Sequence, residues 1–299
     1  MSAKAVPTAG VPMHRLPVTA AILEHELSEI RLLLEREAGV LLDTPNETLS
    51  GAVTELIEKS HASSASNYIE VLRASEAERE KLAESLMPAE TRFFRYPAAF
   101  QALTKLVVPE LESRRCGESP KALRIWSAGC ASGQEPYSIA ISLCEALKCG
   151  KGDWNLRIIG SDIRAGALQE AERGLYRGQD LQNIPGEIVQ TYFARIGQHF
   201  LVKPRVRNLV TFTQANLTKP NYLGRYDCIF CMDVLSRFSS TQKLALVEKL
   251  HLYLEPGGFL FLGQGEKLPA ASNASFRWEN YSDYSVYQRP LASGAAGGH

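Results

Sequence analysis

The segment AETRFFRYPAAF, residues 89–100, sets an arginine on each side of two phenylalanines. A guanidinium stays charged in proteins and can bind a carboxylate through two parallel hydrogen bonds, so such a segment could hold an acidic ligand. An ordinary amphipathic helix presents the same pattern of charges and apolar rings. The segment alone therefore indicates no function, and the remaining motifs must show what Arg95 would bind.

A second candidate is the sequence WSAGCASGQEPYS, in which an apolar run ends at Gly129 and a helix is expected to open at Gln134-Glu135-Pro136. Small residues let a ligand approach the backbone, and proline suits a first helical turn. Open α/β sheets bind nucleotide-like ligands at such a strand-to-helix turn. The pattern GxGxxG is absent, so the dinucleotide fingerprint does not apply.

The next predicted strand, LRIIGSD, ends in Asp162. An acidic residue at this position commonly binds both hydroxyls of a nucleoside ribose. Asp also caps helices well, and the spacing alone leaves the two interpretations equally open.

The six cysteines form no disulfide framework. Cys228 and Cys231 make a CxxC within YDCIFCMD, which is typical of a buried strand. Residues three apart on a strand point to opposite faces, so core packing is expected rather than metal or redox chemistry. A reducing cytoplasm is the expected setting.

Two patterns of hydrophobicity divide the chain. Residues 20–87 are almost free of Gly and Pro and have helical periodicity. From residue 121 onward, short apolar runs rich in β-formers alternate with helical segments, which predicts a parallel sheet flanked by helices. TYFARIGQHFLVKP, residues 191–204, is expected to form a two-stranded ribbon that turns at Gly197-Gln198.

The predicted fold class is therefore α/β, doubly wound, with a β-ribbon insertion and a small all-α domain before it. The expected domains are a flexible leader at 1–19, a helical domain at 20–88, an α/β domain at 89–289 with its insertion at about 190–205, and a disordered tail at 290–299.

Bulk composition excludes several classes of protein. The 299 residues are 45% apolar and 22% charged with zero formal net charge, so neither bulk nucleic-acid binding nor attraction to an acidic membrane is indicated. No apolar run reaches the length of a membrane span, and the N-terminus lacks the apolar centre of a signal peptide. No clear dimer signal is present, and a monomer is expected.

Together these motifs resemble the chemotaxis-receptor (methyl-accepting chemotaxis protein) glutamate O-methyltransferase family, of CheR type. The resemblance extends from about residue 20 to 289, and the following segments carry it in order: ETRFFRYPAAF, LRIWSAGCASGQEPYSIAISL, GSDIRAGALQEAERGLY, FTQANL, YDCIFCMDVLSRF and LEPGGFLFLGQGE. It implies a class I methyltransferase fold, S-adenosylmethionine as cofactor with S-adenosylhomocysteine as product, and methylation of glutamates on a chemoreceptor-like signalling protein.

The resemblance also implies roles for individual residues, and most of these residues have a plain structural alternative. Thr91 could be only a helix cap, Asn216 a turn residue and Leu217 a core residue. The implied set is Thr91 and Arg95 facing the cofactor and active site, Gly129 and Glu135 at the methionine end, Asp162 at the ribose, Asn216 and Leu217 beside the adenine, and Met232 and Asp233 after the fourth strand.

Glutamate methylation explains why an arginine would be needed. A glutamate carboxylate is already ionised at neutral pH, because its reference pKa is about 4.3, so no strong base is required. The enzyme contributes positioning, exclusion of water and management of charge. Arg95 is expected to hold the substrate carboxylate, with Phe93 and Phe94 anchoring the segment and Arg92 at the surface.

One segment departs from the family, which usually has Arg-Asn-Val-Leu-Ile-Tyr-Phe where this chain has MDVLSRF. Arg237 takes the place of the tyrosine thought to lie near the reacting methyl, and Asp233 takes the place of the asparagine. The pair could form a new ion pair, could mark lost or altered catalysis, or Arg237 could hold the substrate carboxylate. The alternative function is a catalytically weak cofactor-binding sensor or interaction module.

Two further departures concern partners. The family's second helix is usually basic, which suits acidic receptor helices, whereas here it carries Glu47, Glu55 and Glu58 against Lys59. Either it docks a different partner or this face is only solvated. The predicted ribbon is short, so tethering to a receptor pentapeptide by strand addition is not expected. Glu266 is expected to give structural support rather than chemistry.

Overall fold

The computed structural model describes residues 22–38, 44–60, 62–86, 91–147, 154–219 and 224–291. The predicted leader and the boundary predicted at Pro88 lie outside these residues, and so does most of the predicted tail. The described residues divide into two units: 22–33, 44–60 and 62–86 form the first, and 34–38 with the described residues from 91 onward form the second.

The first unit is helical, as its periodicity predicts. Its helices are α1 (Glu24–Leu33), α2 (Asn46–Lys59), α3 (Ala65–Ala74) and α4 (Glu76–Leu86). The π-helical turn η1 (Leu34–Ala38) follows α1 along the chain and is assigned to the second unit. Leu49, Val53 and Ile57 recur at every fourth position of α2 and are buried, which gives that helix one apolar face. Ser64 caps α3 by accepting a hydrogen bond from the backbone N–H of Asn67 at 3.2 Å.

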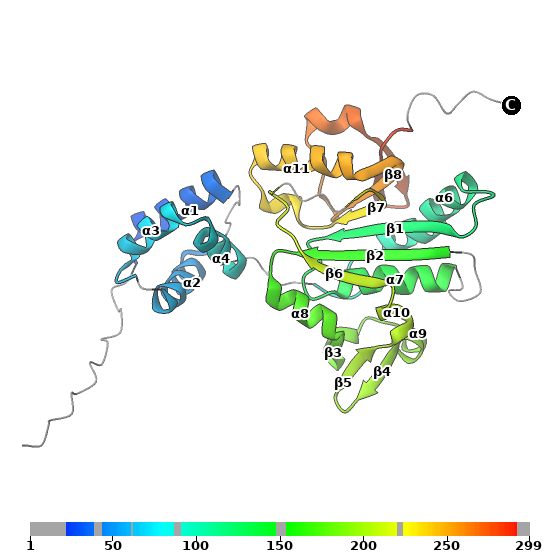
Figure 1. Cartoon of the computed structure of the whole chain (residues 1–299), viewed down its shortest axis with the longest axis horizontal. Coiled ribbons are helices and arrows are strands. Elements are labelled where there is room, and N and C mark those ends of the chain that lie inside the picture. Colours follow the sequence, from blue (N-terminus) through cyan, green and yellow to red (C-terminus); the bar gives the residue numbers. More distant parts are fainter. Residues whose placement is uncertain are drawn as a thin grey trace, which may run out of the picture. The chain divides into compact units, whose positions relative to one another are not determined.

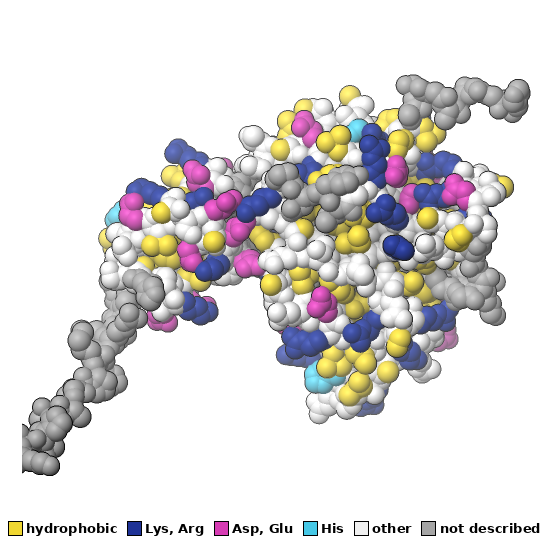
Figure 2. Space-filling model, viewed as in Figure 1, with side chains coloured by type: hydrophobic (Ala, Val, Ile, Leu, Met, Phe, Trp, Pro, Cys, Tyr) yellow, Lys and Arg dark blue, Asp and Glu magenta, His cyan; other side chains and the backbone are white. Residues whose placement is uncertain are grey.

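The acidic face expected on α2 is exposed. Glu47, Glu55 and Glu58 all lie at the surface, and Glu55 pairs with Lys59 one turn later. Figure 2 shows acidic and basic side chains interspersed on the face of this unit that is in view. Whether this face docks a partner stays a prediction.

The second unit contains a seven-stranded sheet in the order β6-β2-β1-β7-β8-β10-β9 (Figure 1). The first five strands in this order are parallel neighbours, whereas β10 runs antiparallel to both β8 and β9. The strands are β1 (Lys121–Ala128), β2 (Trp154–Asp162), β6 (Val210–Gln214), β7 (Tyr226–Cys231), β8 (Leu254–Leu262), β9 (Arg277–Tyr281) and β10 (Tyr284–Gln288).

The sheet is doubly wound, as predicted, because the strand order reverses between β1 and β7. Right-handed crossovers then place helices on both faces: α7 and α8 contact β2 and β6, and α11 contacts β8. The helices are α5 (Pro97–Ala102), α6 (Val108–Arg114), α7 (Gln134–Ala146), α8 (Ala165–Arg173), α9 (Gly186–Tyr192), α10 (Pro204–Arg207) and α11 (Ser240–Tyr253), with shorter turns η2 (Leu103–Val107), η3 (Gly178–Leu181), η4 (Leu235–Arg237) and η5 (Ala270–Ser275).

A separate three-stranded antiparallel sheet contains the predicted ribbon. Strands β4 (Phe193–Ile196) and β5 (His199–Val202) pair around the turn at Gly197-Gln198, where Gly197 has φ +60°. The ribbon is therefore confirmed, but a third strand, β3 (Leu175–Arg177), pairs with β5 and was not predicted. Three residues directly after a helix are too short to show an alternating pattern.

The CxxC lies within β7, and both cysteines are buried and free. Burial raises the pKa of the Cys228 and Cys231 thiols well above the ordinary value, so each behaves as a small apolar core residue. Among the described helices, none combines the length and the apolar character needed to cross a membrane.

Candidate functional site

The carboxyl ends of β1 and β7 lie side by side where the strand order reverses, the place at which open α/β sheets bind ligands. Gly129 follows β1 with φ +81°, and a Cβ built there would lie 2.7 Å from Cγ2 of Val234. The loop can therefore approach the β7 end this closely only with glycine at this position.

Asp162, at the end of β2, is buried and holds this loop. Its Oδ2 accepts the backbone N–H of Ala131 at 2.8 Å, and its Oδ1 accepts the backbone N–H and the Nε–H of Arg164, both at 3.0 Å. Asp162 thus has a structural role, but it is not the helix cap that the sequence left open, because Arg164 is the N-cap of α8 and no side chain caps that helix. Ribose binding stays a prediction, and a ribose would compete with the Arg164 side chain for the carboxylate.

Glu135, the second residue of α7, accepts a hydrogen bond from Ser127 Oγ at 2.6 Å. The pKa of Glu135 is raised to about 7: burial contributes most, the carboxylates of Asp233 and Glu266 also raise it, and the Ser127 hydrogen bond and the charge of Arg95 lower it. The ionised carboxylate is therefore poorly compensated inside the protein, and a cationic ligand group would stabilise it.

Asp233 follows β7 with φ +58° and is the centre of a cluster with Arg95 and Tyr96. Tyr96 Oη lies 2.8 and 2.7 Å from the two carboxylate oxygens of Asp233, which share its one proton, and Arg95 Nη1 lies 3.1 Å from Oδ2. Burial, aided by the hydrogen bond to Asp233, raises the pKa of Tyr96 to about 12, so the phenol remains a donor at neutral pH.

Glu266 supports this cluster from the loop after β8. Its carboxylate accepts the backbone N–H groups of Asp233 at 2.8 Å, Gly263 at 2.9 Å and Ser236 at 3.0 Å. These three bonds tie the carboxyl ends of the neighbouring strands β7 and β8 together. They agree with the structural role predicted for Glu266.

The TRFFR segment is anchored as predicted. Phe93 is buried and makes edge contacts with Tyr176 and Phe193, with ring centroids 4.9 and 5.4 Å apart. The backbone N–H of Phe94 donates to Ser138 Oγ at 2.9 Å, and Arg92 is exposed. The anchored segment continues directly into Arg95 and Tyr96, whose side chains both contact Asp233.

Thr91 lines a hollow of about 490 Å³ between the β1–α7 turn and the three-stranded sheet. Ser132 from the turn, Gln134 from the start of α7 and Tyr176 from β3 also line it. Thr91 is half-buried there, and its role at the cofactor stays a prediction.

Asn216 and Leu217 follow β6. Asn216 Oδ1 accepts the backbone N–H and hydroxyl of Thr218 at 3.0 and 2.8 Å, a turn contact that the sequence left open. Leu217 is half-buried, and its carbonyl accepts from Lys249 Nζ at 2.7 Å. A role of either residue at an adenine ring stays a prediction. Met232, next to Asp233, is buried.

Arg237 is half-buried beside the same cluster. Its Nε–H donates to the backbone carbonyl of Asp233 at 3.0 Å, while the carboxylate of Asp233 pairs with Arg95. The ion pair considered between Arg237 and Asp233 is thus absent among the described contacts. Burial, then the nearby guanidinium of Arg164, lowers the pKa of Arg237.

Tyr96 was not predicted from the sequence as a residue of the site. It stands next to Arg95 in the first motif, but its partner Asp233 is 137 positions away, and no pattern in the sequence indicates that contact.

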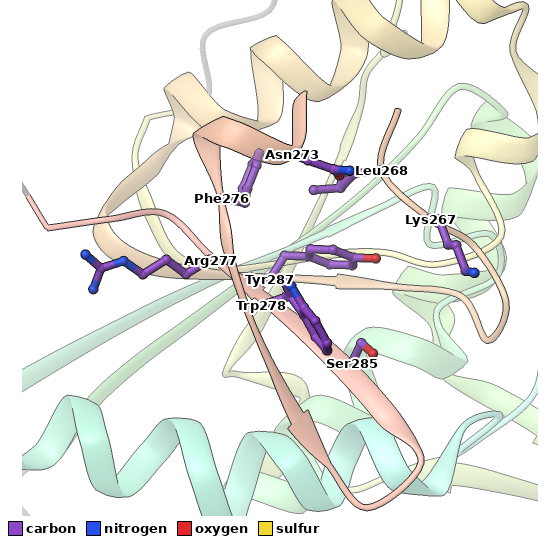
Figure 3. A pocket seen from close by; sticks show the side chains of 8 residues that line it. All are labelled: Lys267, Leu268, Asn273, Phe276, Arg277, Trp278, Ser285 and Tyr287. Carbon is purple, nitrogen blue, oxygen red and sulfur yellow. The ribbon is translucent and has the colours of Figure 1, made fainter. Parts of the chain in front are cut away.

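A larger hollow, of about 730 Å³, lies at the other edge of the sheet, around β9, β10 and η5 (Figure 3). Figure 3 shows Trp278 and Tyr287 side by side in it, with Arg277 pointing away. Its lining contains no residue of the predicted site and does not reach the strand reversal. The lining residues are Lys267, Leu268, Asn273, Phe276, Arg277, Trp278, Ser285 and Tyr287.

The comparison with known families decides which chemistry this site serves. The sequence profile described as "CheR methyltransferase, SAM binding domain" matches residues 89–284. The chain belongs to the CheR methyltransferase family. Its seven-stranded sheet is accordingly the class I methyltransferase fold, and its cofactor is S-adenosylmethionine.

Individual CheR relatives align with most of the chain. Chemotaxis protein methyltransferase 1 of Pseudomonas aeruginosa is 33% identical over 258 residues, which cover 84% of this chain and 92% of that protein. Chemotaxis protein methyltransferase Cher2 of Pseudomonas putida is 32% identical over 81% of this chain and 90% of its own length. Chemotaxis protein methyltransferase 2 of Vibrio cholerae is 34% identical over 78% and 82%.

Proposed function

We propose that this methyltransferase transfers a methyl group from S-adenosylmethionine to glutamate side chains of a chemoreceptor-like signalling protein and produces glutamyl methyl esters. The observation that carries the proposal is the charge pattern at the strand reversal. There, the buried carboxylate of Glu135 is poorly compensated by Arg95, and Arg237 lies close to both Arg95 and Arg164, so the site can receive both a cationic cofactor and an anionic substrate.

The residues present fit the cofactor. Glu135 would bind the ammonium group of the methionine part, because a cation there relieves the cost of its buried charge. Asp162 would bind the ribose, and Asn216 and Leu217 would flank the adenine. Gly129 would admit the cofactor close to the backbone. The remaining predicted contacts are Thr91, Met232, Arg95 and Asp233.

When bound, the cofactor supplies an activated methyl group. The protein's own contribution is to orient the substrate carboxylate, to exclude water and to balance charge. No general base is needed, because glutamate is ionised at neutral pH. Methylation removes one negative charge from the substrate, and a two-state signalling element can respond to such a change.

The proposed partner is a chemoreceptor-like protein in the cytoplasm, and the proposed enzyme is a monomer that does not tether to a receptor pentapeptide. The two-residue turn between β4 and β5 supports the last point, because it leaves no long loop beside which a peptide strand could add. Titration with a receptor C-terminal pentapeptide tests it, and micromolar binding would contradict it.

Calorimetric titration with S-adenosylhomocysteine tests the cofactor site. The parent and Asp283→Ala, which changes an exposed turn residue, should bind, whereas Asp162→Ala should not. Circular dichroism must show that Asp162→Ala is folded, since Asp162 also holds the loop.

Methyl transfer is then measured with labelled S-adenosylmethionine and the cytoplasmic fragment of a chemoreceptor from the source organism. Base-labile label on the fragment supports glutamyl ester formation. Cofactor binding without transfer to any receptor fragment of that organism would instead support a cofactor-binding interaction module.

A further inference from the structure

Three arginines surround the carboxyl ends of β2 and β7, and two of them are paired with carboxylates of the chain. Arg95 pairs with Asp233 at 3.1 Å, and Arg164 pairs with Asp162 at 3.0 Å. Arg237 is the third, close enough to the charges of Arg164, Asp233 and Arg95 to be influenced by all of them.

Arg237 has no such partner in the part of the chain that the structure describes. No carboxylate oxygen of those residues lies within 4.0 Å of its guanidinium nitrogens. Its Nε–H is used by the backbone carbonyl of Asp233, which fixes the direction of the side chain. The two terminal amino groups remain as donors, and two parallel N–H groups match the geometry of a carboxylate.

The surroundings explain why a cation is needed at this place. The carboxylates of Asp233 and Glu266 are close enough to Glu135 to raise its pKa, so an entering glutamate would meet three acidic groups. Arg95 is already neutralised by Asp233, whose carboxylate also accepts the single hydroxyl proton of Tyr96. A second carboxylate beside Asp233 would be repelled unless another cation received it.

We propose that Arg237 binds the carboxylate of the substrate glutamate and determines the substrate specificity of this enzyme, while Arg95 positions Asp233. This inference rests on the proposed function, because it assumes a glutamate substrate. It gives Arg237 the role that the sequence suggested first for Arg95. The arginine that replaces the family's tyrosine then moves the carboxylate-binding role from Arg95 to Arg237, and it does not mark a loss of catalysis.

The substitution that restores the family residue gives the sharpest test. Arg237→Tyr, Arg237→Gln and Arg237→Lys are compared with the parent in methyl transfer to the receptor fragment, with exposed Arg92→Gln as the matched control. Losing a charged hydrogen-bonded pair should raise KM for the fragment about 10- to 100-fold in Arg237→Gln and Arg237→Tyr. Arg237→Lys should retain part of the affinity, and Arg92→Gln should resemble the parent.

Higher activity of Arg237→Tyr than of the parent would overturn the proposal, because the arginine would then be a defect. Unchanged KM in Arg237→Gln would do the same. Affinity for S-adenosylhomocysteine should be unaltered in all variants, so a failure of cofactor binding, which concerns the proposed function, is seen separately.

A second measurement needs no turnover. Protein saturated with S-adenosylhomocysteine is titrated with N-acetylglutamate α-amide, which has one side-chain carboxylate, while the arginine Nε–H signals are followed by nitrogen-15 NMR. The Arg237 Nε–H signal is assigned as the one that is missing in Arg237→Lys. N-acetylglutamate α-amide should shift this signal, whereas N-acetylglutamine α-amide should not. If other arginine signals shift and the Arg237 signal does not, the proposal that Arg237 binds the carboxylate is refuted. This result does not depend on whether any receptor fragment is methylated.

Discussion

Glu135→Gln should stabilise the cofactor-free protein, although it removes a residue of the proposed binding site. Burial raises the pKa of Glu135 from the ordinary value of 4.5 to about 7. Between these pH values the folded state binds more protons than the unfolded state, so the stability of the parent falls as the pH rises. A pKa shift of one unit corresponds to about 1.4 kcal/mol. Above pH 7, the ionised Glu135 should therefore lower the free energy of unfolding by about 3 kcal/mol.

Glutamine keeps an oxygen that can accept the hydrogen bond from Ser127 Oγ, but it carries no charge. The variant and the parent should therefore have similar stability near pH 4.5 and should diverge up to pH 8. For a unit of about 200 residues, each kcal/mol moves Tm by roughly 2–4 °C, so the variant should melt about 6–12 °C higher at pH 8. At the same pH, binding of S-adenosylhomocysteine should weaken about 10- to 100-fold, because the partner of its ammonium group is lost.

Thermal unfolding at pH 5 and pH 8 measures the first effect, and calorimetric titration measures the second. Glu187→Gln is the matched control, because Glu187 also lies in the first turn of a helix but is exposed, and it should follow the parent at both pH values. A Glu135→Gln stability difference that is equal at pH 5 and pH 8 would refute the reasoning, since it could not come from the carboxylate charge.

Three other substitutions test the packing of the second unit. Phe93→Ala empties a buried aromatic contact and should cost about 3–5 kcal/mol in urea unfolding; a cost below about 1 kcal/mol would mean that the segment is not anchored by this ring. Gly263→Ala should abolish methyl transfer while Gly166→Ala does not, because a Cβ at Gly263 would lie 2.1 Å from Oδ1 of Asp233 whereas Gly166 faces open space. Asp227→Ala removes a buried carboxylate that pairs with the half-buried Arg115 and accepts the backbone N–H of Arg124; it should cost about 1–3 kcal/mol, and a denaturation midpoint equal to that of the parent would show that these contacts contribute nothing.

The central strands could be predicted because burial on both faces leaves a clear mark in the sequence. All six residues of β7 are buried, and its sequence is an almost continuous apolar run. Strand β9, by contrast, reads RWENY with four exposed residues, and its pairing depends on β10 rather than on an apolar face of its own. Its polarity is typical of a loop, so only the structure reveals it.

The candidate site shows the same division. Glycine and acid positions at strand ends follow from the geometry of a parallel sheet, so Gly129 and Asp162 could be proposed from spacing and the family resemblance. The residue that pairs with each charged side chain could not be predicted in this way. Arg95 pairs with Asp233 across the strand reversal, and this pairing depends on how TRFFR packs against Ser138 and the three-stranded sheet. Tertiary packing therefore decides which arginine is already neutralised, and local sequence carries no trace of that choice.

The three backbone hydrogen bonds accepted by Glu266 have a consequence for how mutational data on this enzyme should be interpreted. A screen scored by methylation alone would rank Glu266 with the residues that bind the reactants, because losing it frees the backbone at Asp233. Its defect should nevertheless differ in kind. Substrate concentration can compensate for a lost contact to a ligand, whereas no concentration of ligand restores a loop that no longer has one conformation.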